Sequence, residues 1–179
     1  MESVLGGQNV DDDILVQELQ GQGETQLHDV FFNACLTAKL PKSAMYLITQ
    51  DKESNTIDKA LSSAEEPSII FKISEEEVIL EIMKTYSKGS LKIMSTEDRL
   101  KENLLHFFIR NRFTRALNHF LHTIPNKEEM RQLCFQPNRT KRIPLMSSIR
   151  QGMENSAMEL WKLLETMELE ACDKDPEAD

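Results

Sequence analysis

The apolar residues of this chain recur at helical spacing in several short segments. Between residues 27 and 38, the i, i+3, i+4 spacing of a one-sided helix connects Leu27, Val30, Phe31, Ala34, Cys35 and Ala38. Ser43 is a residue type that caps helix N-termini, and a second helix is expected after it. No stretch alternates between apolar and polar residues for long enough to predict a strand. The pattern predicts an all-α fold.

Four similar tetrads precede apolar helical segments along the chain. They are Thr25-Gln26-Leu27-His28, Ser68-Ile69-Ile70-Phe71, Asn103-Leu104-Leu105-His106 and Ile143-Pro144-Leu145-Met146. Their third residues lie 43, 35 and 40 positions apart. Self-similarity at a period of about 33 to 47 residues is typical of stacked helical repeats, each made of a helix pair. Leu105 and Leu145 are therefore expected in the core.

The two ends of the chain lack this pattern. Residues 1–22 hold three glycines and the run Asp11–Asp13, and we expect a disordered tail there. Residues 169–179 contain five acidic residues and a proline, which predicts a second, acidic disordered tail. The repeat array is then expected over residues 23–168.

The tetrads, with a helix pair after each, resemble ankyrin repeats. Gly23 to His28 match the opening of the ankyrin motif except for its proline, Asn103–His106 keep the leucine and histidine, and Pro144-Leu145 keep the middle pair. The small alanines of the family motif are replaced by Val30, Ile73, Phe108 and Ser148. The resemblance implies a short stack of about four degenerate repeats, similar to the truncated inhibitor-of-NF-κB-like ankyrin proteins of insect viruses.

Composition excludes several classes of function. The formal net charge of −9 argues against binding to the phosphate backbone of nucleic acid. No apolar run approaches the roughly 20 residues that cross a bilayer, and no signal peptide is recognisable at Met1. The three cysteines form no CxxC pair, and we expect Cys35 and Cys134 to be small buried residues. The expected location is the cytosol or the nucleus.

Catalytic and metal-binding patterns are weak. His106, His119 and His122 form the one plausible metal cluster, but HxxH without a further ligand is a poor zinc motif. In an ankyrin-like repeat, His106 would instead form hydrogen bonds to backbone in the turn between repeats. His28 and Cys35 would lie about 10 Å apart on one helix, too far for proton transfer. We therefore expect no enzyme activity, no cofactor and no bound metal.

A partner-binding surface is predicted around Phe107. In the ankyrin register, Phe107 faces the concave side, and Arg110, Arg112 and Phe113 follow it closely. Aromatic residues and arginine are the residue types that dominate binding energy at protein interfaces. The alternative is that Phe107 and Phe113 pack against a neighbouring repeat.

Three further residues complete the predicted groove. Asp29, Lys72 and Ser147 occupy the same register as Phe107 in the other repeats, so the groove would carry mixed charge. The basic run from Arg139 to Arg142 is interpreted as a solvated finger, a contact for an acidic partner, or a weak nuclear signal.

These features favour a non-enzymatic protein–protein interaction module. It is expected to be monomeric and to bind another protein through its concave face and fingers, as an adaptor or a competitive inhibitor. The alternative is a helical structural protein that assembles with itself, which the nine methionines and eight phenylalanines would suit. The oligomeric state distinguishes the two.

Overall fold

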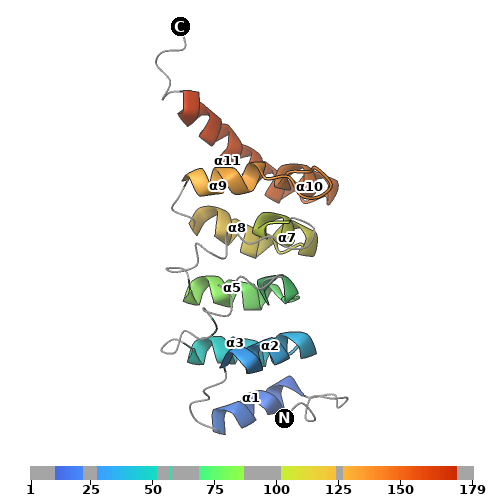
Figure 1. Cartoon of the computed structure of the whole chain (residues 1–179), viewed down its shortest axis with the longest axis vertical. Coiled ribbons are helices and arrows are strands. Elements are labelled where there is room, and N and C mark those ends of the chain that lie inside the picture. Colours follow the sequence, from blue (N-terminus) through green and yellow to red (C-terminus); the bar gives the residue numbers. More distant parts are fainter. Residues whose placement is uncertain are drawn as a thin grey trace. The chain divides into compact units, whose positions relative to one another are not determined.

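The computed structural model describes residues 11–21, 28–51, 57, 69–86, 102–123 and 127–172. Within these ranges all regular elements are helices, and no strand occurs (Figure 1). The all-α prediction is confirmed. Two compact units divide the chain, residues 1–90 and residues 91–179. None of the described helices is both long enough and apolar enough to cross a membrane.

Unit 1 is centred on one helix. Its elements are α1 (Asp12–Gly21), α2 (His28–Ala38), α3 (Pro41–Gln50), the 3-10 helix η1 (Ile69–Lys72) and α5 (Glu76–Thr85). Helix α3 packs against α1, α2 and α5. The largest fully buried side chains of this unit are Phe32, Leu47, Ile48, Ile57, Ile70, Ile73, Ile79 and Ile82.

The expected N-terminal disordered tail requires correction, because residues 12–21 form helix α1. Asp11 precedes this helix, and its Oδ1 accepts a hydrogen bond from the backbone N–H of Asp13 at 2.9 Å. This is the hydrogen bond of an N-terminal cap. Leu19 of α1 is buried. Residues 1–10 lie outside the described residues.

Asp12 supplies the N-terminal cap of a different helix. Helix α3 begins after Leu40, which has no side-chain oxygen to receive the free N–H groups of the first turn. The Asp12 carboxylate accepts from the backbone N–H of Lys42 at 2.8 Å and from that of Ser43 at 2.9 Å. Asp13 forms an exposed ion pair with the Lys42 ammonium at 2.7 Å. Asp12 and Asp13 therefore connect α1 to α3 through hydrogen bonds and an ion pair.

Unit 2 contains five helices in its described part. They are α7 (Leu104–Asn111), α8 (Thr114–Thr123), α9 (Lys127–Phe135), α10 (Pro144–Arg150) and α11 (Glu154–Cys172). Helix α7 packs against α8 and α10, and α11 packs against α8, α9 and α10. The acidic tail expected over residues 169–179 is corrected in part, because α11 continues to Cys172. Residues 173–179 are outside the described ranges.

Three helix pairs share one turn. In α2–α3, α7–α8 and α10–α11 a residue in the turn after the first helix has a left-handed backbone: Lys39 (φ 57°), Arg112 (φ 60°) and Gly152 (φ 68°). Lys39 and Arg112 follow their helices directly, and Gly152 follows α10 after Gln151. In each turn, the N–H of the left-handed residue bonds to the carbonyl three positions back. The next N–H bonds to the carbonyl five positions back, at 2.8 to 3.0 Å. This pair of bonds is the Schellman motif that ends many helices.

The shared turn fixes the register of the repeats. Arg112 and Gly152 are 40 positions apart, so Leu145 is the counterpart of Leu105, as the tetrads predicted. Lys39 and Arg112 are 73 positions apart, so the counterpart of Leu105 in α2 is the buried Phe32. The first tetrad took Leu27 as its anchor, and Leu27 lies outside the described residues. Helix α2 is longer than α7 and begins earlier relative to its turn.

A buried polar network connects α7 to the segment that precedes α10. Asn103 caps α7 through its Oδ1, which accepts from the backbone N–H of His106 at 3.2 Å. The Asn103 amide donates to the carbonyl of Leu133 at 2.8 Å and to the Gln136 side chain at 2.9 Å. His106 lies between Asn103 Oδ1 (3.0 Å from Nδ1) and the carbonyl oxygen of Arg142 (2.8 Å from Nε2). Both ring nitrogens are thus held by protein oxygens, one of them backbone, as expected for a structural histidine.

The buried Leu105 should contribute more to stability than its counterpart. Leu105 is fully buried, whereas Leu145 is half-buried and is less of a core residue than the sequence predicted. We expect Leu105→Ala to lower the free energy of unfolding by about 2 to 5 kcal/mol, and Leu145→Ala to lower it by less. Urea titration followed by circular dichroism measures both. Equal losses would contradict the burial difference between the two helix pairs.

Removing the cap that Asp12 provides should destabilise unit 1. We expect Asp12→Ala to cost about 0.5 to 2 kcal/mol, the usual range for a lost N-cap. Asp13→Ala is the matched control: it removes an exposed ion pair, which contributes about 0 to 1 kcal/mol. Thermal melts of the two variants give the comparison. A larger loss for Asp13→Ala would show that the carboxylate of Asp12 does not cap α3.

Candidate interaction surface

The prediction that Phe107 faces an exposed concave surface was wrong. Only 1% of the Phe107 surface is exposed. Its ring centroid lies 5.8 Å from those of Phe108 and Phe113, and its contact with Phe113 is edge to face. Phe113 is buried as well. The alternative interpretation of the sequence, in which Phe107 and Phe113 are packing residues, agrees with their burial.

Arg110 is held against this aromatic cluster. Its guanidinium carbon lies 5.9 Å from the centroid of the Phe107 ring, within the range of a cation–π contact. Its Nη1 forms an ion pair with the carboxylate of Glu102. About a third of the Arg110 side chain remains exposed. Arg110 is therefore a partly covered residue of unit 2 and not a mobile surface charge.

The remaining predicted residues are divided between the two units. Arg112 is exposed, and its Nη2 lies 3.3 Å from the carbonyl oxygen of Gln151, to which it donates. Ser147 is half-buried in α10. Lys72 is exposed at the end of η1 in unit 1. Asp29 is a residue of α2, and its side chain is outside the described part.

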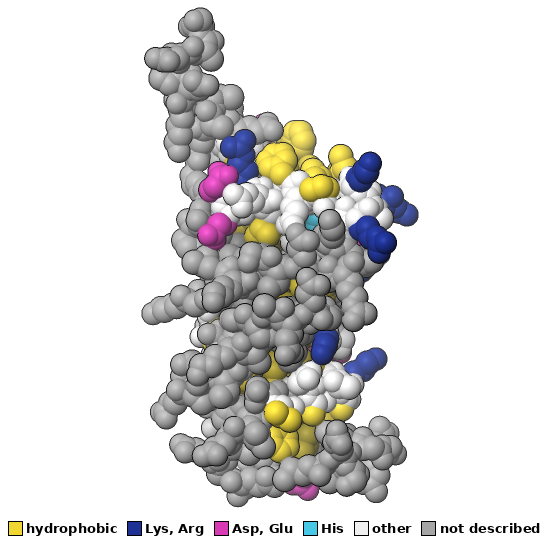
Figure 2. All heavy atoms as spheres, viewed as in Figure 1, with side chains coloured by type: hydrophobic (Ala, Val, Ile, Leu, Met, Phe, Trp, Pro, Cys, Tyr) yellow, Lys and Arg dark blue, Asp and Glu magenta, His cyan; other side chains and the backbone are white. Residues whose placement is uncertain are grey.

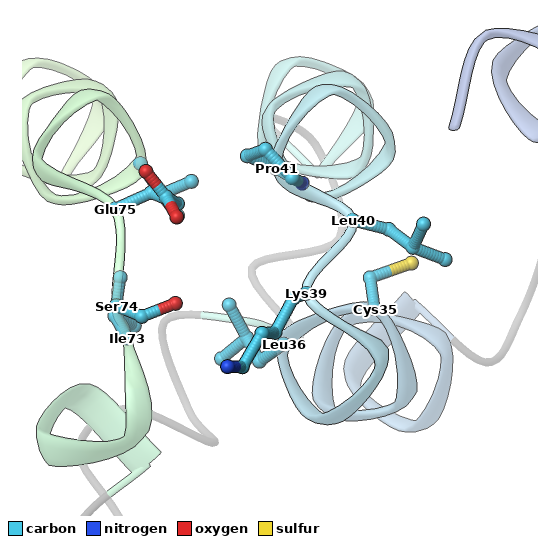
Figure 3. A pocket seen from close by; sticks show the side chains of 9 residues that line it. Cys35, Leu36, Lys39, Leu40, Pro41, Ile73, Ser74 and Glu75 are labelled. Carbon is cyan, nitrogen blue, oxygen red and sulfur yellow. The ribbon is translucent and has the colours of Figure 1, made fainter. Parts of the chain in front are cut away.

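The hollow drawn in Figure 3 is too small for a substrate. It lies in unit 1, and its lining residues are Cys35, Leu36, Lys39, Leu40, Pro41, Ile73, Ser74, Glu75 and Val78. Its interior volume is about 10 Å³, roughly the space that one water molecule needs. Within the described residues, no group of three or more His, Cys, Asp or Glu side chains could hold a metal ion.

Cys35 and Cys134 are buried, as the sequence predicted. Burial, with a smaller contribution from the nearby Asp12 carboxylate, raises the pKa of Cys35 to about 12. Burial alone raises the pKa of Cys134 to about 12. A thiol with such a pKa has almost no thiolate at neutral pH, and the thiolate is the nucleophile. These cysteines are packing residues.

A surface that the sequence analysis did not predict lies on the last helix pair. Met146 and Ile149 of α10 are 54% and 64% exposed, and Met158 and Trp161 of α11 are 54% and 55% exposed. We call these four residues the α10–α11 face. Figure 2 shows hydrophobic side chains gathered over this part of unit 2, near the top of the view, with lysine and arginine side chains beside them.

Three of the four counterparts of this face in the preceding helix pair are covered or half-covered. At the 40-residue spacing, Met146 corresponds to His106 and Ile149 corresponds to Ile109. His106 and Ile109 are both buried, on a helix that packs against α10. Trp161 likewise corresponds to Leu121, which is half-buried. The fourth, Met158, corresponds to Asn118, which is exposed. The contrast between the two pairs therefore rests on Met146, Ile149 and Trp161, whose counterparts in α7–α8 are covered or half-covered.

A rigid loop brings positive charge to this face. Asn138 Oδ1 accepts from the backbone N–H groups of Thr140 and Arg142, at 3.0 and 3.1 Å. The backbone N–H of Asn138 donates to the carbonyl of Arg142 at 3.0 Å, which closes the loop. Arg139 and Lys141 are exposed on it. The basic run interpreted as a finger is thus a folded turn that leads directly into α10.

Loss of the Phe107 ring should affect folding more than loss of the Arg110 charge. We expect Phe107→Ala to lower the free energy of unfolding by about 3 to 5 kcal/mol, as for other buried phenylalanines. Arg110→Ala removes a partly exposed ion pair and should cost about 1 kcal/mol or less, because solvent screens such pairs. Denaturant unfolding of the two variants is the measurement. If Phe107→Ala left stability unchanged, the ring would not be a core residue.

Comparison of the chain with protein-family models, with curated proteins and with solved structures gave no match.

Proposed function

We propose that this protein is a non-enzymatic protein-interaction module, built as a short ankyrin-like stack of helix pairs. The observation that supports it best is the contrast between two copies of one structural unit. The α7–α8 pair buries His106 and Ile109, while the α10–α11 pair leaves Met146 and Ile149 exposed. Repeat units of this kind bury their faces against a neighbour, so an uncovered apolar face is a place for another protein to bind.

The binding surface in this proposal differs from the groove that the sequence suggested. Phe107 and Phe113 are buried and cannot contact a partner without unfolding. The α10–α11 face replaces them, since it has large apolar side chains, including the chain's one tryptophan, that are accessible in the folded state. Tryptophan is enriched among the residues that dominate binding energy at interfaces.

The module would act as an adaptor or as a competitive inhibitor. It is expected in the cytosol or the nucleus, where the buried thiols of Cys35 and Cys134 would stay reduced. The alternative function, a helical structural protein that assembles with itself, uses the same face with a second copy as the occupant. The exposed methionines Met146 and Met158 would suit either kind of contact.

Site-specific photo-crosslinking in the native cell tests the proposal. A photoreactive phenylalanine analogue replaces Ile149 on the α10–α11 face or, as the control, the exposed Thr123 at the end of α8. We expect a covalent adduct with a different polypeptide at position 149 and none at position 123. Adding Met146→Glu should remove the adduct, because a carboxylate would place charge within the apolar contact.

The outcomes separate the two functions. An adduct that contains two copies of this chain and no other polypeptide would favour the self-assembling structural protein. Adducts of equal yield at positions 149 and 123 would show nonspecific contact and contradict a defined surface. No adduct at position 149 would contradict the interaction module.

A further inference from the structure

We propose that the α10–α11 face binds an acidic amphipathic helix of a partner protein. This inference rests on the proposed function and specifies its partner. It combines the shape of the apolar face, the element that covers the equivalent face of the preceding helix pair, and the charge around α10.

The exposed apolar residues lie on one side of each of the two helices. Met146, Ile149 and Arg150 have i, i+3, i+4 spacing and therefore share one side of α10. Met158 and Trp161 have i, i+3 spacing on α11. In α10, Met146 and Ile149 lie two positions before and one position after the buried Ser148. In α11, Met158 and Trp161 lie at the same two positions relative to the buried Leu160. The two helices are joined by a tight turn at Gly152 and pack together, so both exposed sides belong to one helix pair.

The equivalent face of the preceding pair indicates what kind of element fits. Helix α7 is covered by α10 and by the segment before it, and the contact includes the His106–Arg142 hydrogen bond. The side chain that replaces His106 in α10 is Met146, which cannot donate such a bond. The occupant of the α10–α11 face is therefore a helix that contributes apolar side chains and not a polar loop.

The charge near α10 indicates the sign of the partner. From Met130 to Met153 the chain has no acidic residue and five basic ones: Arg131, Arg139, Lys141, Arg142 and Arg150. This segment is positive within a chain whose net charge is −9. In the part of the chain that the structure describes, no ion pair involves the side chains of Arg139, Lys141, Arg142 or Arg150. Carboxylates of a partner would complement them.

Other occupants fit these observations less well. A second copy of the chain would bring a strongly acidic molecule as a whole, but the same positive segment would meet itself in a symmetric contact. Nucleic acid would be repelled by the net charge of −9. An anionic membrane would accept the positive segment, but the covered counterpart of this face contacts a protein helix.

Fluorescence of the one tryptophan provides the test. The probe is a synthetic peptide of about 20 residues, long enough to be helical, with leucines on one side, glutamates on the other and no tryptophan. A matched peptide has lysines in place of the glutamates. Because Trp161 is on the proposed face, binding of the acidic peptide should shift its emission to shorter wavelength. The lysine peptide should give no shift.

Charge and apolar variants refine the test. Arg150→Glu should weaken acidic-peptide binding at least about fivefold, and raising the salt from about 0.05 to about 0.5 M should weaken it further. Lys84→Glu is the matched control, an equal charge change on an exposed residue of α5 in unit 1, and should have no effect. Ile149→Ser should abolish the shift while leaving the melting temperature unchanged, since Ile149 is exposed.

Each remaining outcome overturns the inference. Equal binding of the lysine peptide would show that charge does not select the partner. A shift with vesicles of anionic lipid but not with the acidic peptide would assign the face to a membrane. A shift that grows with protein concentration alone would assign it to a second copy. If no peptide binds while the crosslink at position 149 persists, the partner class is wrong and the interaction module stands.

Discussion

The covering of α7 by α10 and the loop before it is the contact on which unit 2 depends. Helix α7 has eight residues, too few to be stable alone, and six in succession, from Leu104 to Ile109, are buried. The polar part of the contact satisfies groups that could not be left unpaired in the interior: the Asn103 amide, the backbone N–H of His106 in the first turn of α7 and the ring N–H of His106. Each helix pair is therefore incomplete until another element covers it.

This requirement explains why the last described pair has an unusual surface. Helix α10 supplies the cover for α7 with one side and leaves its other side, with Met146 and Ile149, exposed. On this side, Met146 and Ile149 are exposed apolar residues, and Arg150 follows directly on the same helix. In the proposed function this side receives a partner.

The sequence predicted the helical class and the 40-residue correspondence between Leu105 and Leu145, but it could not determine burial. Leu105 and Leu145 were equivalent in the tetrads, and they are equivalent in the turn register. The different exposures of Ile109 and Ile149 depend on what packs against each helix, and neighbouring residues in the sequence do not contain that information. Phe107 was placed on the wrong side because a helical wheel assumes one buried side, whereas α7 is buried all round.

Local composition also misled at the N-terminus. Three consecutive aspartates are typical of a solvated tail. In the structure, Asp12 instead caps α3, which begins about 30 residues later in the chain. Only the fold brings those groups together. The α10–α11 face itself could have been suspected from the 40-residue spacing, which aligns Trp161 with Leu121 and Met146 with His106, but its exposure required the structure.

Native-state hydrogen exchange of the free protein is the most direct test of the claim that α7 is covered and α10 is not. The two helices end in turns of the same type, at Arg112 and Gly152. The exchange rates of their amides should therefore differ mainly because of what covers each helix. At low protein concentration, the amides of Phe107 to Asn111 should exchange at least about tenfold more slowly than those of Ser147 to Gln151. Equal or greater protection of α10 would contradict the account, because it would mean that the α10–α11 face is already covered and cannot receive a partner.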